Sequence, residues 1–382
     1  MRSTRWRRRL RTGVWLAAAV VAATGCSSSD DQTVRTGAPA APRGAAAKPV
    51  TDARLVAGGL GWATTESGLF VTTDAGAAWR RWALPVPSAS VLHVALLGPK
   101  RALVASNDGT AVEVLSTSDA GATWRRTKLG SVAAGPAEGQ FAHEGDRVAG
   151  LLVKRATSSN FSLADWYATT DGGATWARRE APAAGQVSVT GDGTVWLAGG
   201  PARNQLFKSL DGGASWTEVA LPPNLPRHAI ALEAPVARPD GLTVLPVTVP
   251  GERTASVVFL ATRDKGTSWK EAARAQVPAA VGAGVTIPSS PGATTDTLVV
   301  AAPDGSEVVR VPLRGGKPRK ISPRGLAKGV VGVELTTEEL GWATFTSSSC
   351  REDKTACTST TGILVTRNGG ESWQPANPTS GA

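Results

Sequence analysis

The stretch TTDGGATW, residues Thr169 to Trp176, is one of six related copies distributed along the chain. Each copy has Ser or Thr first, an acidic or amide residue third, Gly fifth, a small residue seventh and Trp last. The copies begin at Thr72, Thr117, Thr169, Ser209, Thr262 and Thr366, and the last one has Asn in place of Asp. Because self-similarity at a regular spacing is the signature of a repeat architecture, this stretch decides the fold.

The spacing of the copies is typical of propeller blades. Consecutive third positions lie 45, 52, 40 and 53 residues apart, and the last step, from Asp264 to Asn368, is 104 residues. Because this step is twice as long as the others, we infer that one copy has degenerated, and the stretch from Val308 to Ile321 lies midway within it. A second marker, LGWAT at Leu60 and Leu340, recurs after 280 residues, which gives about 47 residues per blade over six steps.

The sequence therefore predicts an all-β fold, a seven-bladed β-propeller of four-stranded antiparallel blades with Asp-containing hairpins, over residues 51–378. A six-bladed ring with a long insertion is the alternative. Runs rich in Val, Ile, Phe, Trp and Thr precede each copy, as expected for strands, and no long helical periodicity follows residue 30. The expected blades are residues 51–85, 86–131, 132–183, 184–222, 223–276, 277–323 and 324–378.

The residue types in each copy suit a tight hairpin. Gly adopts left-handed backbone without steric cost, Asp accepts hydrogen bonds from turn amides, and the Trp ring is expected to be buried between blades. We therefore assign structural roles to the acidic or amide positions and the tryptophans, which are Asp74, Trp79, Asp119, Trp124, Asp171, Trp176, Asp211, Trp216, Asp264, Trp269, Asn368 and Trp373.

These copies resemble the Asp-box, or BNR, hairpin of β-propeller proteins. The last repeat, with GWA at Gly341 and TRNGGESW at Thr366, is similar to the photosystem II assembly-factor type of propeller that many bacterial lipoproteins share. The resemblance implies a non-catalytic propeller that binds a protein partner, with its Asp-boxes on the outer rim, away from the central channel. A glycan ligand is also open.

Asp-box propellers also include sialidases, which use a tyrosine nucleophile and, as the resemblance implies, an arginine triad. The single tyrosine, Tyr167, lies four residues before Asp171 on a strand that enters a box, and no Arg-Ile-Pro motif precedes the first box. We therefore expect no enzymatic activity. The alternative is a glycan-acting hydrolase, sialidase-like or another glycosidase with two facing carboxyl groups, for which the candidates are Glu138, Glu144, Asp146 and Glu233.

The first 25 residues have the pattern of an export signal. Six arginines precede an apolar run from Val14 to Ala23, which is too short to span a membrane stably. The following Ala-Thr-Gly-Cys sequence resembles a bacterial lipobox and implies cleavage before Cys26 and lipidation of its sulfur; an ordinary signal peptide is the alternative. Residues 26–50 are rich in Ser, Ala, Pro and Gly and predict a flexible tether. We therefore expect an exported lipoprotein on the extracytoplasmic face of the cell membrane or outer envelope.

Two further cysteines, Cys350 and Cys357, form an isolated close pair, which in an exported protein indicates a disulfide. A metal site would need more ligands nearby. His93, His143 and His228 are scattered over separate repeats, and we expect them to be structural. The sequence predicts no metal and no cofactor.

The net charge of +10 falls to +4 for residues 26–382, because six of the positive charges are arginines of the export signal. One basic cluster remains, formed by Arg310, Arg314, Lys317, Arg319, Lys320, Arg324 and Lys328. It is interpreted as a solvated face, with anionic lipid or an acidic partner as the alternative. Without interleaved aromatic residues, nucleic acid is not an expected partner. We expect a monomer.

Overall fold

The computed structural model describes residues 49–131, 137–156, 162–225, 230–238, 240–278, 296–350 and 357–379. The regular elements in this part of the chain are β-strands and two short 3-10 helices, η1 (Ala57–Gly59) and η2 (Ser88–Ser90). The all-β prediction is confirmed. The expected signal peptide, Cys26 and nearly all of the expected tether lie outside the described residues.

The strands form antiparallel sheets of strands that follow one another in the sequence, except that the first four and the last four strands are joined in one eight-stranded sheet. Its two halves are named sheet 1 and sheet 7. Sheet 1 contains β1 (Val50–Leu55), β2 (Gly61–Thr65), β3 (Gly68–Thr72) and β4 (Arg80–Trp82). Sheet 2 contains β5 (Val91–Leu96), β6 (Ala102–Asn107), β7 (Ala111–Thr117) and β8 (Arg125–Ser131). Sheet 3 contains β9 (Ala137–Glu144), β10 (Arg147–Ala156), β11 (Ser162–Ala168) and β12 (Ala177–Glu180). Sheet 4 contains β13 (Gly185–Val189), β14 (Val195–Gly199), β15 (Gln205–Ser209) and β16 (Thr217–Glu218).

The remaining sheets continue this order. Sheet 5 contains β17 (Ala231–Leu232), β18 (Val236–Ala237), β19 (Thr243–Val249), β20 (Thr254–Thr262) and β21 (Lys270–Pro278). Sheet 6, with three described strands, contains β22 (Thr297–Ala301), β23 (Val308–Pro312) and β24 (Arg319–Ile321). Sheet 7 contains β25 (Val330–Leu335), β26 (Gly341–Cys350), β27 (Cys357–Thr366) and β28 (Gln374–Pro375). The degenerate repeat from Val308 to Ile321 thus forms the hairpin of β23 and β24.

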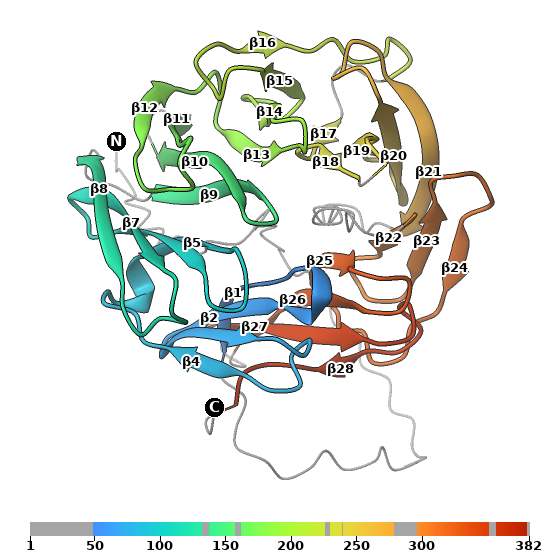
Figure 1. Ribbon diagram of the computed structural model, residues 1–382. Coiled ribbons are helices and arrows are strands. Elements are labelled where there is room, and N and C mark those ends of the chain that lie inside the picture. Colours follow the sequence, from blue (N-terminus) through green and yellow to red (C-terminus); the bar gives the residue numbers. More distant parts are fainter. Residues whose placement is uncertain are drawn as a thin grey trace, which may run out of the picture.

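The sheets lie side by side around a common centre, in a β-propeller-like arrangement (Figure 1). In sheets 2, 3 and 4 the first strand lies nearest the centre and the last strand lies at the outer rim. The first strands β1, β5, β9, β13 and β25 therefore present side chains to the middle of the molecule.

Both faces of the sheets are covered. Every residue of β2, β3 and β14 is buried, and because successive residues of a strand point to opposite faces, each of these strands packs on both sides. Seven hydrophobic clusters occur among the described residues, and each joins two consecutive sheets. In one of them Trp62 and Trp82 of sheet 1 pack with Val94 and Val104 of sheet 2.

One cluster brings the last sheet against the first. Val50 and Ala63 of sheet 1 pack with Trp342 and Ile363 of sheet 7. A single residue pair, Val50 with Thr361, also joins β1 to β27 and makes the two sheets continuous. Two side-chain hydrogen bonds add to this contact, from Trp79 Nε1 to Ala376 O at 2.9 Å and from Arg367 to Asp74 O at 3.4 Å. Within the described residues, no strand is exchanged between the two sheets.

All six Asp-box turns share one hydrogen-bond pattern. In sheet 3, Thr169 Oγ1 donates to Asp171 Oδ1 at 2.9 Å and accepts from Gly173 N at 2.9 Å, while Thr175 N donates to Asp171 Oδ1 at 2.8 Å. The same three bonds recur in the other five boxes, and in the last one Asn368 accepts through its amide oxygen. Hydrogen bonds, chiefly from the Thr123 hydroxyl, lower the pKa of Asp119 to about 2.

Several boxes also pack tightly against the preceding sheet. A Cβ on Gly213 would lie 2.2 Å from Nε1 of Trp166 in sheet 3, and one on Gly266 would lie 2.7 Å from Cη2 of Trp196 in sheet 4. Both glycines also have left-handed backbone, so no other residue fits there. Of the box tryptophans, Trp269 and Trp373 are buried, whereas Trp79, Trp124, Trp176 and Trp216 are partly exposed.

The two cysteines face each other at the level of the backbone. Cys350 at the end of β26 is paired in register with Cys357 at the start of β27. Directly opposed residues of an antiparallel pair have Cα atoms about 4.5–5.5 Å apart, within the range that a disulfide spans. The backbone therefore permits the disulfide, which stays a prediction, with a chain-entropy contribution of about 2.5 kcal/mol.

Replacing Trp373 tests the packing between sheets 6 and 7. Its ring is 4% exposed in the cluster that joins these sheets, and its Nε1 donates to Gly370 O at 3.0 Å. We expect Trp373→Ala to lower the free energy of unfolding by about 3–5 kcal/mol, as for other large-to-small core changes, in equilibrium urea unfolding followed by circular dichroism. Leu210→Ala, at a side chain that is 64% exposed, is the control. Equal stability of the two variants would contradict the packing argument.

Candidate functional site

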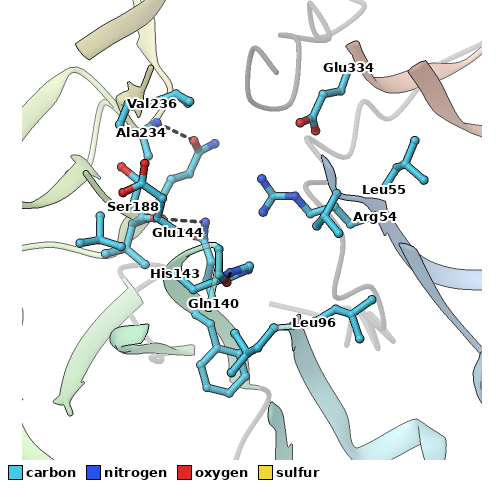
Figure 2. A pocket seen from close by; sticks show the side chains of 18 of the residues that line it. Arg54, Leu55, Leu96, Gln140, His143, Glu144, Ser188, Ala234, Val236 and Glu334 are labelled. Atoms are coloured by element: carbon cyan, nitrogen blue, oxygen red, sulfur yellow. Dashed lines mark hydrogen bonds between the residues drawn. The ribbon is translucent and has the colours of Figure 1, made fainter. Parts of the chain in front are cut away.

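Polar residues from several inner strands line one central cavity of about 310 Å³ (Figure 2). Arg54 comes from β1, Glu334 from β25, and Glu233 from the connection between β17 and β18. His143 and Glu144, at the end of β9, lie across the cavity from Arg54 and Glu334. The volume is at the lower end of the range for small-ligand pockets.

Amide and hydroxyl side chains fasten the inner strands beside the cavity. Gln140 of β9 donates through Nε2 to Val187 O at 3.0 Å and accepts from Val187 N at 3.1 Å, which ties sheet 3 to sheet 4. Gln186 of β13 accepts from Ala234 N at 3.0 Å, and Ser188 donates to the carbonyl of Pro235. Since these polar groups are used by the protein itself, they form the wall and are not free for a ligand.

Two carboxyl groups of the cavity are buried without a partner. Glu233 is 5% exposed and Glu334 is 8% exposed, and no other described residue forms a hydrogen bond or ion pair with either carboxyl. Burial raises the pKa of Glu233 to about 8, with Arg203 acting in the opposite direction. Burial likewise raises the pKa of Glu334 to about 7, opposed by Arg54. Their carboxyl oxygens are not among the fully buried atoms that lack a partner in the described residues, so both groups face the space of the cavity.

The wall across from Arg54 and Glu334 adds a neutral imidazole and a third carboxyl. Burial, and then the charge of Arg54, lower the pKa of His143 to about 4, so its ring is uncharged at neutral pH. Burial raises the pKa of Glu144, with Arg147 opposing this change and Asp192 adding to it. The cavity thus combines proton-donating carboxylic acids, one guanidinium and an uncharged imidazole.

Of the four carboxyl residues that the sequence offered as catalytic candidates, three lie at the cavity. Glu144, Asp146 and Glu233 line the cavity, although the Asp146 side chain is 74% exposed and lies 3.6 Å from Arg101. Glu138 is not among the lining residues and pairs with Lys154 at 2.6 Å. None of the Asp-box acids or tryptophans lines the cavity.

Tyr167 and the other histidines lie elsewhere. Tyr167 is buried in the hydrophobic cluster between sheets 2 and 3, where burial raises its pKa. His93 is buried between Trp62 and Phe141 and accepts a hydrogen bond from Phe141 N at 3.4 Å. His228 lies outside the described residues. Of the described histidines, His143 alone is at the cavity.

Arg54 and Glu334 were not expected from the sequence. Each lies eight residues before the Trp of an LGWAT marker and pairs in register with that Trp, Arg54 with Trp62 and Glu334 with Trp342. The two side chains thus occupy equivalent positions in sheets 1 and 7. Counting back from the marker would have found both.

The basic cluster of residues 310–328 is largely ion-paired. Arg310 pairs with Glu338, Arg314 with Asp296 at 3.0 Å, Arg319 with Glu371 at 2.8 Å and Lys320 with Glu307 at 2.9 Å. These pairs offset much of the local positive charge, which supports the interpretation of a solvated face.

Neither a metal-ligand cluster nor a membrane-spanning helix occurs among the described residues. No group of three or more His, Cys, Asp and Glu residues is placed there to hold a metal ion. Within the same ranges, no helix has the length and apolar character needed to cross a membrane.

No protein-family model matches the chain, and no curated protein matches it in sequence. Among solved structures, a family GH74 xyloglucanase from Xanthomonas campestris is similar with a TM-score of 0.50 and 16% identity, over 88% of this chain and 56% of that enzyme. An uncharacterised protein from Listeria monocytogenes has a TM-score of 0.49 and 9% identity, over 85% and 97%. A family PL25 ulvan lyase has a TM-score of 0.47 and 11% identity, over 75% and 81%. The chain spans little more than half of the xyloglucanase, and the likeness shows a β-propeller-like fold alone.

The buried carboxyl of Glu233 should make stability depend on pH. Because its pKa is raised to about 8, the folded state holds the proton more tightly than the unfolded state does. The free energy of unfolding is therefore unaffected by this group below the ordinary pKa of a glutamate, and it falls as the pH rises from there to about 8. Glu233→Gln keeps a neutral group, so we expect it to gain stability relative to wild type between pH 5 and 8, approaching about 1.4 kcal/mol per pH unit.

Urea unfolding at several pH values measures this difference. Glu371→Gln, which changes a carboxyl on the rim beside Arg319, is the matched control and should follow the wild-type profile. A constant offset between Glu233→Gln and wild type at all pH values would show that the Glu233 carboxyl does not titrate in this range.

Proposed function

We propose that this protein is an exported, lipid-anchored, seven-bladed β-propeller that acts as a non-catalytic binding scaffold for a protein partner at the cell envelope. The observation that carries the binding role is the central cavity, where two buried carboxyl groups lack partners while the neighbouring Gln140, Gln186 and Ser188 are hydrogen-bonded within the protein. A buried carboxyl without a partner destabilises the free protein, and a bound ligand would supply that partner.

The blade count is supported by the hydrophobic clusters. Seven clusters join consecutive sheets, including sheet 7 with sheet 1, as a ring of seven blades requires. Sheet 6, which carries the degenerate repeat, has apolar residues on both faces of β22, with Leu298 in one cluster and Val299 in the next. It therefore packs as a blade although its Asp-box has degenerated.

The anchor is supported by the sequence around Cys26, which follows the apolar run with Ala-Thr-Gly. Acylation together with the tether that the sequence predicts for residues 26–50 would hold the propeller at a membrane surface, and rigid sheets that present variable loops suit partner binding there. As a monomer, each propeller would offer one cavity.

A glycan-acting hydrolase is the second candidate. Glu233 and Glu334 have raised pKa values, which a general acid requires, and Glu144 lies across the cavity from Glu334. Tyr167 has no part in this alternative because it is buried in the core between sheets 2 and 3, so a sialidase mechanism with a tyrosine nucleophile is not supported.

Replacing Cys26 tests the anchor. We expect Cys26→Ser to move the protein from the membrane fraction to the soluble exported fraction, because the thiol that would carry the lipid is gone. Fractionation and intact-mass measurement check this, and Cys350→Ser, which removes a thiol far from the signal, should leave attachment unchanged. Continued membrane attachment of Cys26→Ser would refute the lipid anchor.

A second experiment separates binding from catalysis. The full-length lipoprotein, purified in detergent, is assayed against fluorogenic sialosides and a glycan panel, and in parallel is crosslinked in its own envelope and its partners are identified by mass spectrometry. We expect one reproducible crosslinked partner at the cavity face and no turnover. Turnover that is lost in Glu233→Gln or Glu334→Gln would overturn the scaffold and favour the hydrolase.

A further inference from the structure

We propose that the central cavity binds a positively charged group, in chemical terms a primary ammonium, supplied by a lysine side chain of the partner or by a free small amine. This inference rests on the proposed binding role and names the group that the site recognises.

Carboxyl groups outnumber cations at the cavity. Glu144, Glu233 and Glu334 line it together with one guanidinium, that of Arg54. Asp146 is offset by Arg101. Arg54 lies on the same side as Glu334 and acts on its charge, so one guanidinium among the lining residues faces three carboxyl groups.

Charged groups just outside the lining do not reverse this balance. Asp52 lies two residues before Arg54 and on the same face of β1, since strand side chains alternate. It is a further acid rather than a cation, and burial raises its pKa well above the ordinary range. Arg147 acts on Glu144, but its guanidinium is held by Gly191 O at 3.0 Å. Arg203 acts on Glu233 through space and forms no ion pair with it among the described residues. His143 is uncharged.

The burial of two unpartnered carboxyls gives an independent argument. Glu233 and Glu334 are each more than nine-tenths buried, and their carboxyl groups have no hydrogen bond or ion pair with another described residue. An ammonium group has three donors and no acceptor, so it can satisfy several carboxylates at once. A neutral hydroxyl group has a single donor, so it could satisfy only one of the two carboxylates.

The wall also suits an aliphatic stem. Leu55, Leu96, Phe141 and Val187 contribute apolar surface beside the carboxyls. Lysine and small diamines carry a chain of methylene groups that packs on apolar surface while the charged end reaches polar partners. A volume of about 310 Å³ accommodates such a stem.

Binding of a cation should be coupled to proton release. Without a ligand, Glu233 and Glu334 hold their protons near neutral pH because burial raises their pKa values to about 8 and about 7. A bound cation favours the ionised carboxylates. Affinity should therefore rise as the pH increases from 6 to 8.

Matched probes test the inference directly. The full-length lipoprotein in detergent is titrated by calorimetry with the pentapeptide Gly-Ser-Lys-Ser-Gly, with the same peptide carrying acetyl-lysine, and with putrescine. We expect the lysine peptide or putrescine to bind at least tenfold more tightly than the acetylated peptide, with affinity rising about tenfold from pH 6 to pH 8. Tighter binding of the peptide identifies a protein as the source of the ammonium, and tighter binding of putrescine identifies a free amine.

Variants assign the effect to the cavity. The double variant Glu233→Gln/Glu334→Gln should lose at least tenfold in affinity and lose the pH dependence, whereas Glu371→Gln on the rim should behave as wild type. The inference would be overturned if the lysine and acetyl-lysine peptides bound equally well. It would also be overturned if glucose, added as a neutral probe, bound while neither the lysine peptide nor putrescine did. The comparison of the probes uses the wild-type protein, so it does not depend on whether the double variant folds.

Failure of this inference is distinguishable from failure of the proposed function. If no cation binds but the crosslinked partner is still recovered, the scaffold stands and the ammonium site is wrong. If the cations bind as expected but no partner is recovered from the envelope, the cavity is a cation site and the protein scaffold is wrong.

Discussion

The whole architecture depends on one constraint: each sheet has two apolar faces and must be covered on both. β2 and β14, buried at every residue, show that no face is left for solvent. A stack of such sheets would expose the first and the last, and the contact of Val50 and Ala63 with Trp342 and Ile363 removes both exposed faces at once. The Asp-boxes serve the same constraint, because glycines such as Gly213 let one sheet approach a tryptophan of the one before it.

The same constraint decides where charges lie. Faces of the sheets accept mainly apolar side chains, and among the described residues few ionisable groups, such as the ion-paired Asp165, are buried away from the centre. At the rim ionisable residues meet solvent and one another, as Arg319 and Glu371 do, and such exposed pairs contribute little to stability. At the centre there is less water and less room, and Glu233 and Glu334 are buried without partners. The centre is therefore where a ligand gains most from the charges of the protein.

The sequence predicted the features that depend on local physics. The turn chemistry of TTDGGATW located the hairpins, and the interval between Asp264 and Asn368 revealed a repeat that had lost its box, which forms β23 and β24. The cavity was only partly predicted, through Glu144, Asp146 and Glu233. Arg54 and Glu334 are 280 residues apart and meet only because sheet 7 packs on sheet 1. Burial of an individual box tryptophan also depends on the neighbouring sheet, which explains why Trp124 is partly exposed although Trp373 is buried.

Arg54 and Glu334 also show why the repeats say little about function. They occupy the same register position opposite the Trp of LGWAT, yet one is a cation and the other an acid. The fold requires the Trp, since it fills the space between sheets, but it places no demand on the residue opposite, whose side chain reaches the centre. That position is free to change with the ligand while the repeat is retained. Proteins that share this scaffold can therefore differ completely in the chemistry at their centre, and a likeness of fold alone does not identify the ligand.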